Sequence, residues 1–294
     1  DFEGRNEQGQ DQQSKMKKEE FMKVAKENPA FYHPNVWPDE TLPCLKHTLK
    51  EMGMLIRSIG KLVGRRCDAY VLSQCDGYAG NKMESVIDSS LCVKARLLHY
   101  FPSPSDEDDS DNQEEDPKVT SDKGKEETTK DDVDYSTWCG WHNDHCSMTG
   151  LVPAMYMNAK GEEVTCPDPD AGLYIKSRKG ELIHVNVPPD ALAFQIGETA
   201  QIHTGGVLQA TPHAVRGYCP KNTACKGISR ESFAVFMQPD YFGDMAIPNG
   251  RTIEDAQKRD AENHLPRTVR NLRSRWSPGI NFGEFSQNTF EAFS

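Results

Sequence analysis

The order of apolar and polar residues divides the chain into a helical first part and a strand-rich remainder. In the first part, FMKVAKENP predicts a short helix that ends before Pro29, since the residue preceding a proline disfavours helical backbone angles. A much longer helix is predicted from about Asp39 to Arg66. Its apolar residues recur every three or four positions, at Leu45, Leu49, Met52, Ile56, Ile59 and Val63. This stripe indicates a scaffold helix that packs on a sheet.

After this helix, short β-prone runs are separated by glycine, proline and aspartate. The runs are VKARLLHYF, SMTGLVPAMYM, AGLYIKS, ELIHVNV, ALAFQIG and ESFAVFMQ. Such spacing is typical of an antiparallel double sheet or barrel. The segment SRKGE predicts a hairpin with Gly180 in the tight turn. Near the C-terminus, TIEDAQKRDAENH and LPRTVRNLRSRW suit helices or loops, with their arginines on a solvated face. We therefore expect a mainly β fold with flanking helices.

One acidic segment changes the picture that composition gives. The formal net charge is −11, yet residues 103–136 alone hold 14 Asp or Glu against 4 Lys. The rest of the chain is therefore nearly balanced in charge. The segment has no apolar periodicity and cannot repay the entropy cost of ordering itself. We expect residues 103–136 to be a disordered insertion within a single domain, residues 1–294, whose N-terminal part is incomplete.

Cysteine usage and hydropathy limit the compartment and the partners. The nine cysteines are odd in number and never spaced as CxxC, which argues against a disulfide framework and against a structural zinc site. No apolar run approaches the ~18 to 20 residues of a membrane span. We expect a monomeric cytoplasmic protein that binds a small molecule and neither nucleic acid nor a membrane. Whether a targeting segment precedes Asp1 is left open.

The stretch WHNDHCSMTG, residues 141–150, concentrates candidate metal ligands. If it lies on a strand, alternation puts His142 and Asp144 on one face. A facial iron site needs a second histidine and leaves three coordination positions open for substrates and oxygen. His184, His203 and His213 are the candidates. We prefer His213, because ATPHAVRG follows a Gly-Gly turn, precedes another strand and can return beside the first.

A carboxylate-binding pair is predicted farther along, in SRESFAVFMQP. On a strand, Arg230 and Ser232 share a face. A guanidinium beside a hydroxyl is well shaped to hold a carboxylate through charge-assisted hydrogen bonds. Taken alone, the same frame would also suit an edge-strand arginine in a surface ion pair.

Four segments in order carry a resemblance to a known family: WHNDHCSMTGL, GLYIKSRKGELIHVNVPPDALAFQIGE, GGVLQATPHAV and RESFAVFMQP. They resemble the iron(II)- and 2-oxoglutarate-dependent oxygenases of the isopenicillin N synthase-like family. The resemblance implies a double-stranded β-helix, or jelly-roll, core. It implies catalytic iron(II) held by His142, Asp144 and His213, and 2-oxoglutarate held by Arg230 and Ser232. It also implies O2 consumption, with ascorbate as a candidate reductant, and a small organic substrate that is hydroxylated or desaturated with release of succinate and CO2.

Two departures from the family concern the co-substrate. Family members carry Asn-x-Tyr before a proline, and the tyrosine hydroxyl helps to hold 2-oxoglutarate. The matching stretch here is HYFP, so that hydroxyl is missing at Phe101 unless Tyr100 substitutes through a register shift. The connection RGYCPKNTACKGIS is longer than usual, and its Arg216 could compete as an anion ligand. The rival hypotheses are an iron oxidase of the same fold that does not use 2-oxoglutarate, and a non-catalytic jelly-roll binding protein.

Overall fold

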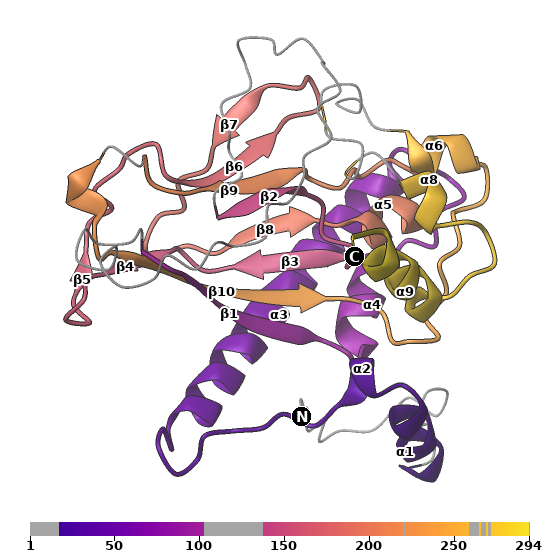
Figure 1. The fold of residues 1–294 in the computed structure, drawn as a ribbon. Helices are drawn as coiled ribbons and strands as arrows, with labels where there is room; N and C mark the ends of the chain where they lie inside the picture. Colours follow the sequence, from indigo (N-terminus) through magenta and orange to yellow (C-terminus); the bar gives the residue numbers. More distant parts are fainter. Residues whose placement is uncertain are drawn as a thin grey trace.

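The computed structural model describes residues 18–102, 138–219, 222–258, 265, 269 and 272–293. Two antiparallel sheets form its centre, and helices flank them (Figure 1). The expected acidic insertion, residues 103–136, lies outside the described residues. The helices described include none with the length and apolar character of a membrane span.

The larger sheet is built around the longest strand, β10 (Ser229–Met237). Strand β1 (Lys94–Tyr100) pairs along one edge of β10, and β3 and β4 pair along its other edge. The remaining strands of this sheet are β3 (Met148–Leu151), β4 (Met155–Met157), β5 (Glu163–Val164) and β8 (Ala193–Ile196).

The smaller sheet has the strand order β2-β9-β6-β7. Its strands are β2 (Cys139–His142), β6 (Gly172–Lys176), β7 (Leu182–His184) and β9 (His213–Arg216). The predicted hairpin between β6 and β7 is confirmed, with Gly180 at a φ of 80°. Each of the six β-prone runs contains at least one observed strand.

The long helix α3 spans Leu45–Leu72, so the predicted start near Asp39 and end near Arg66 were both about six residues too early. Residues 39–44 form turns, because Leu42 precedes Pro43 and is disfavoured in a helix. At the other end, α3 continues past Arg66, and Asp68 in this last part contacts a neighbouring helix. The spacing of apolar residues does not predict this contact. The buried carboxylate of Asp68 accepts hydrogen bonds from the backbone N–H groups of Met83 and Glu84, at the start of α4 (Lys82–Ser89).

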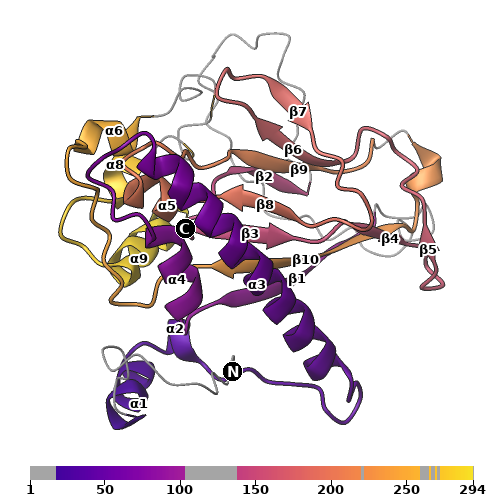
Figure 2. The same ribbon diagram turned by 180° about the vertical axis from the view of Figure 1, so that it is seen from behind.

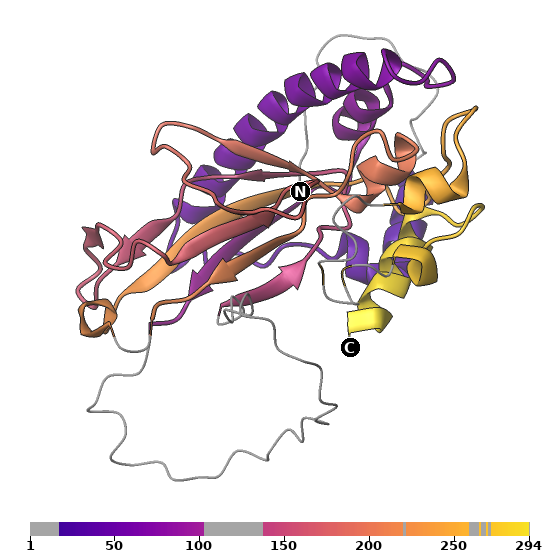
Figure 3. The same cartoon turned by 90° about the horizontal axis from the view of Figure 1, so that it is seen from above.

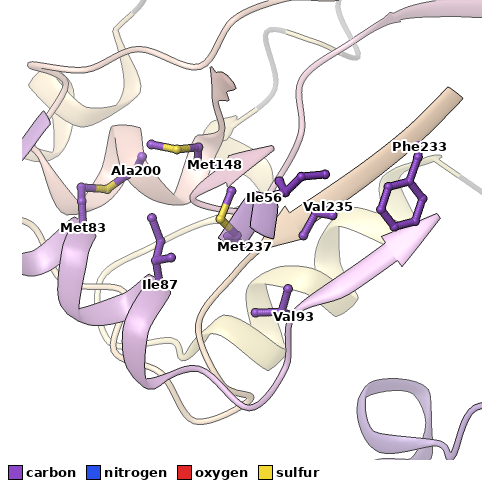
Figure 4. Packing of buried hydrophobic residues seen from close by; sticks show 9 residues of the cluster. All are labelled: Ile56, Met83, Ile87, Val93, Met148, Ala200, Phe233, Val235 and Met237. Atoms are coloured by element: carbon purple, nitrogen blue, oxygen red, sulfur yellow. The ribbon is translucent and has the colours of Figure 1, made fainter. Parts of the chain in front are cut away.

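The predicted packing of this helix on a sheet is confirmed (Figure 2). The buried line of α3 includes three glycines, Gly53, Gly60 and Gly64, whereas Met52 of the predicted stripe is exposed. A Cβ at Gly60 would lie 2.5 Å from Met237 Sδ, so the glycine permits the helix to approach β10 closely. The main apolar core fills this interface (Figure 4). Its members are Ile56, Met83, Ile87, Val93, Met148, Ala200, Phe233, Val235 and Met237.

The remaining helices lie outside the sheets. Helix α1 (Lys18–Glu27) ends before Pro29 as predicted, and α2 (Pro29–Tyr32) begins at that proline. The others are α5 (Glu198–His203), the 3-10 helix η2 (Thr223–Cys225), α6 (Ile253–Gln257), α8 (Leu272–Arg275) and α9 (Phe282–Phe293). Seen from above, α3 runs along one side of the sheets and the C-terminal helices gather at one end (Figure 3).

Strand alternation divides β10 between two environments. Phe233, Val235 and Met237 point outward into the core beneath α3. The residues that alternate with them along β10 point inward and line a cavity. They are Arg230, Ser232, Ala234 and Phe236. The fold thus places the predicted carboxylate-binding pair on the inner face of the larger sheet.

Candidate functional site

A cavity of about 860 Å³ lies between the inner faces of the two sheets. Strands β1, β3, β8 and β10 line it from the larger sheet, and β2, β6, β7 and β9 line it from the smaller one. Helices α2 and α9 contribute Phe31 and Phe290. All five side chains that the sequence predicts for the site, His142, Asp144, His213, Arg230 and Ser232, line this one cavity.

His142, Asp144 and His213 converge in the cavity. His142 ends β2 and is paired with His213, the first residue of β9. The Nε2 atoms of His142 and His213 lie 3.9 and 3.8 Å from Asp144 Oδ1, and the candidate ligand atoms of the three residues all lie within 4.8 Å of one another. Asp144 itself lies beyond the end of β2, so strand alternation alone does not explain the position of its carboxylate.

Backbone carbonyls fix the orientation of both imidazoles. His142 Nδ1 lies 2.8 Å from the Gly140 carbonyl, and His213 Nδ1 lies 3.0 Å from the Thr211 carbonyl. Because a carbonyl oxygen only accepts, each Nδ1 carries the proton. Each Nε2 is then directed at the cluster, which is the orientation that a metal-ligating histidine needs. Burial would lower the pKa of His142, but its contacts with Cys139 and Asp144 outweigh burial and raise the pKa to about 9, so a metal ion would displace a proton from this ring.

The Asp144 carboxylate is oriented by two side chains on neighbouring strands. Thr149 on β3 and Gln195 on β8 are paired in register, and they donate hydrogen bonds of 2.5 and 2.6 Å to Oδ2. The other oxygen, Oδ1, faces the two histidines. Burial would raise the pKa of Asp144, but the two histidines and the two hydrogen bonds outweigh it and lower the pKa. The group is therefore held as an anionic oxygen donor.

The loop that carries Asp144 is fastened to α5 and, through α5, to a buried ion pair. The Asp144 carbonyl accepts a 2.8 Å bond from the Glu198 N–H, and the Asn143 side chain donates a 3.1 Å bond to the Glu198 carboxylate. The guanidinium of Arg275, on α8, donates two hydrogen bonds of 2.7 Å to that carboxylate. The expectation that the C-terminal arginines form a solvated face is wrong for Arg275, which is 3% exposed.

This set of donors fits a divalent metal ion. Burial lowers the pKa of His213 to about 4, so its imidazole is neutral near pH 7. Two imidazole nitrogens and one carboxylate oxygen on one side of a cavity match the facial arrangement of non-haem iron(II) sites. Cys146 lies buried against Thr149, and Cys139 Sγ lies 3.7 Å from His142 Nδ1, on the side of the ring away from the cluster. Among the described residues, the candidate ligand set is therefore the three residues without a thiol.

Arg230 and Ser232 form a second polar centre on the inner face of β10. The Arg230 side chain is buried, and its Nε has no hydrogen-bond partner. Tyr100 on β1 and Tyr156 on β4 are the cross-strand neighbours of Arg230, and the guanidinium lies 4.9 Å from the centre of the Tyr100 ring. A buried cation with an unsatisfied donor is a strong recognition group for an anionic ligand.

The strand register decides between Tyr100 and Phe101. Tyr100 lines the cavity beside Arg230, whereas Phe101 is 75% exposed on the outside. The register-shift alternative is therefore the one that agrees with the structure. Tyr156 was missed by sequence reasoning, because only the pairing of β4 with β10 brings it beside Arg230. The longer connection after His213 does not redirect Arg216 into the cavity. Its guanidinium faces Asp170, with an Nη1 to Oδ2 distance of 3.8 Å.

The two rejected histidines do not join the cluster. His203 is buried in α5, with Nε2 2.6 Å from the Asp244 carbonyl. His184 lies on β7, stacks on Tyr174 and contacts the Ala171 carbonyl through Nε2. Both histidines have structural partners, and the preference for His213 agrees with the geometry.

Known structures share this fold. A protein of Caulobacter crescentus assigned to the 2OG-Fe(II) oxygenase family aligns with a TM-score of 0.54 at 20% identity, covering 91% of this chain and 65% of that one. A full-length Neurospora crassa protein in complex with alpha-KG and thymine gives 0.52 at 19% identity, covering 88% and 61%. The same Neurospora crassa protein with alpha-KG alone gives 0.51 at 21% identity, covering 86% and 60%. The expected jelly-roll fold class is thus confirmed, and the chain spans less than two thirds of the length of these proteins. No protein-family model and no curated protein matches the sequence.

Proposed function

We propose that the protein is an iron(II)- and 2-oxoglutarate-dependent oxygenase of the isopenicillin N synthase-like type, which hydroxylates or desaturates a small organic substrate. The observation that carries this proposal is the meeting of two unlike centres in one cavity. One is the cluster of His142, Asp144 and His213, and the other is the buried pair of Arg230 and Ser232. A metal site alone would suit many hydrolases, and a buried arginine alone would suit many binding proteins.

In this proposal, iron(II) is held by Nε2 of His142, Nε2 of His213 and Oδ1 of Asp144. Bound there, the metal supplies oxygen activation coupled to the decarboxylation of 2-oxoglutarate to succinate and CO2, with ascorbate as an outside reductant. The chain itself orients the ligands. Thr149 and Gln195 hold the second Asp144 oxygen, which keeps Oδ1 directed at the histidines. Arranged ligands of this kind bind metal without reorganisation.

The distal carboxylate of 2-oxoglutarate is assigned to Arg230 and Ser232. The unsatisfied Nε of Arg230 supports this, because an anion there would supply the missing acceptor. Tyr100 and Tyr156 are the cross-strand neighbours of Arg230 and line the cavity with it. These same features weigh against the oxidase rival, because that reaction does not bind 2-oxoglutarate and so leaves this cation without the anion assigned to it here.

The proposal is tested by measuring iron and 2-oxoglutarate binding separately. His213→Ala should lose most of its iron, whereas His47→Ala, an exposed histidine on α3, should keep it. Arg230→Ala should keep iron but bind 2-oxoglutarate at least ~30-fold more weakly, because truncating one partner of a buried charge pair costs roughly 2 to 5 kcal/mol. Arg216→Ala is the matched control and should bind 2-oxoglutarate normally.

Oxygen uptake separates the rivals. Uptake that requires 2-oxoglutarate and yields succinate supports the proposal. Uptake that proceeds without 2-oxoglutarate would establish the oxidase, and iron binding without any uptake across a broad metabolite panel would favour the binding protein. Iron retained by His213→Ala would refute the ligand assignment.

A further inference from the structure

The cavity contains a second basic region on β1, apart from Arg230. Strand alternation directs Lys94, Arg96, Leu98 and Tyr100 into the cavity. Tyr100 is paired with Arg230, whereas Arg96 is paired with Ala234. Four residues of strand therefore separate Arg96 from Arg230 in register, or about 13 Å at a rise of about 3.3 Å per residue. A carboxylate held by Arg230 is too far away to neutralise Arg96.

The protein itself does not neutralise Arg96 either. Its guanidinium lies 5.2 Å from the centre of the Phe236 ring. Within the described part of the chain, the Arg96 side chain makes no hydrogen bond or ion pair. The contact between His99 of β1 and the Glu231 carboxylate lies on the outer face of the sheet. Among the described residues, only Asp144 and Asp168 line the cavity with carboxylates. Asp144 faces the two histidines. Asp168 accepts hydrogen bonds from the backbone N–H groups of Asp170 and Cys219, so both carboxylates are engaged elsewhere.

Apolar side chains form part of the cavity surface around Arg96, beside the polar groups of Thr149, Gln238 and His145. Leu98 and Leu151 line the cavity beside it, and Phe236 lies beneath its guanidinium. Phe31 and Phe290 line the cavity from α2 and α9, and the Lys94 ammonium lies 4.9 Å from the Phe31 ring centre. A site with an apolar wall, a guanidinium that makes no ion pair within the described residues and a neighbouring ammonium is complementary to an apolar molecule that carries an anionic group.

We propose that the substrate is an apolar carboxylic acid whose carboxylate is bound by Arg96, with Lys94 adding to the positive field. The proposal rests on the function proposed above, in which Arg230 is reserved for 2-oxoglutarate, and it names the substrate class of the same site. Arg96 would then decide which substrates enter, and their apolar bodies would extend along Leu98 and Leu151.

The test compares acids with their uncharged amides. Hexanoate, decanoate, phenylacetate and phenylbutanoate are titrated calorimetrically into the protein loaded with 2-oxoglutarate, each beside its primary amide. At least one acid should bind about ten-fold more tightly than its amide. Arg96→Ala should remove that preference by weakening acid binding about ten-fold, equivalent to ~1.4 kcal/mol. Arg96→Lys should restore part of it. Arg66→Ala, an exposed arginine on α3 outside the cavity, should leave it unchanged.

Three outcomes would overturn the inference. Acids and amides that bind equally, or not at all, show that the region does not recognise carboxylates. Equal weakening of acid and amide in Arg96→Ala assigns to Arg96 a packing role on Phe236. Loss of 2-oxoglutarate itself in Arg96→Ala assigns Arg96 to the co-substrate. Because the acid preference can also be measured in the metal-free protein, it stays distinguishable from failure of the proposed oxygenase activity.

Discussion

Replacing Arg275 with methionine should strongly destabilise the fold and loosen the metal cluster as well. Arg275 and Glu198 are each only 2% exposed in their side chains, and they form a bidentate pair at 2.7 Å. Methionine keeps much of the volume and the helical propensity of arginine but leaves the Glu198 carboxylate buried without its cation. Breaking one side of a buried ion pair costs roughly 3 to 5 kcal/mol. That is a large fraction of the ~5 to 15 kcal/mol that stabilises a typical domain.

The effect should reach the cluster through two hydrogen bonds. Glu198 accepts from Asn143, which lies between His142 and Asp144, and its backbone N–H donates to the Asp144 carbonyl. If Glu198 shifts toward water, both of these hydrogen bonds should lengthen or break. We therefore expect Arg275→Met to bind iron more weakly even at temperatures where it remains folded.

Urea unfolding followed by circular dichroism gives the stability change, and equilibrium dialysis gives the iron affinity. Arg273→Met is the matched control, because Arg273 lies on the same short helix but is exposed, and it should change stability by less than ~0.5 kcal/mol. The double variant Arg275→Met with Glu198→Gln should recover part of the loss, since no charge is then buried alone. If Arg275→Met costs no more than Arg273→Met, the argument from an uncompensated buried charge is refuted.

Three further predictions concern single contacts. Thr149→Val removes one of the two hydrogen bonds that hold Asp144 Oδ2 and should weaken iron binding measurably while the melting temperature changes little; unchanged iron affinity would show that Gln195 suffices. Gly197→Ala places a Cβ against the Cys146 carbonyl and close to the Asp144 carbonyl, so overpacking should cost ~1 to 3 kcal/mol or more in urea unfolding and should lower iron content; a neutral result would mean that the loop moves freely. Burial, aided by Lys82, lowers the pKa of His203 to about 4, whereas the unfolded chain titrates near 6.5. Since the unfolded state gains the proton first, His203 alone should reduce stability by at most ~1.4 kcal/mol per pH unit as the pH drops from about 6.5 to about 4. The variant His203→Gln should therefore show a smaller fall in its urea midpoint between about pH 7 and about pH 5 than the parent protein.

The sequence by itself determined the features that depend on local patterns. Alternation with a period of two places Arg230 and Ser232 on one face of a strand, wherever that strand lies in the sheet. The β-prone runs and the turn at Gly180 were equally local, and the structure contains strands and a hairpin there. The choice of His213 needed only the expectation that its strand returns beside the strand of His142, and the two residues are paired.

Only the tertiary structure decided the features that depend on segments far apart in the chain. The pairing of β1 with β10 turned Tyr100 inward and Phe101 outward, and one residue of register would have exchanged them. Arg275 reads as one more basic residue in a polar segment until Glu198, 77 positions away, meets it in a buried pair. Arg96 likewise becomes a cavity residue only because the two sheets form a cavity at its strand, although its side chain stays exposed to solvent. Local backbone preferences specify which way a side chain points from its own element, but burial and charge pairing depend on which other elements pack against it.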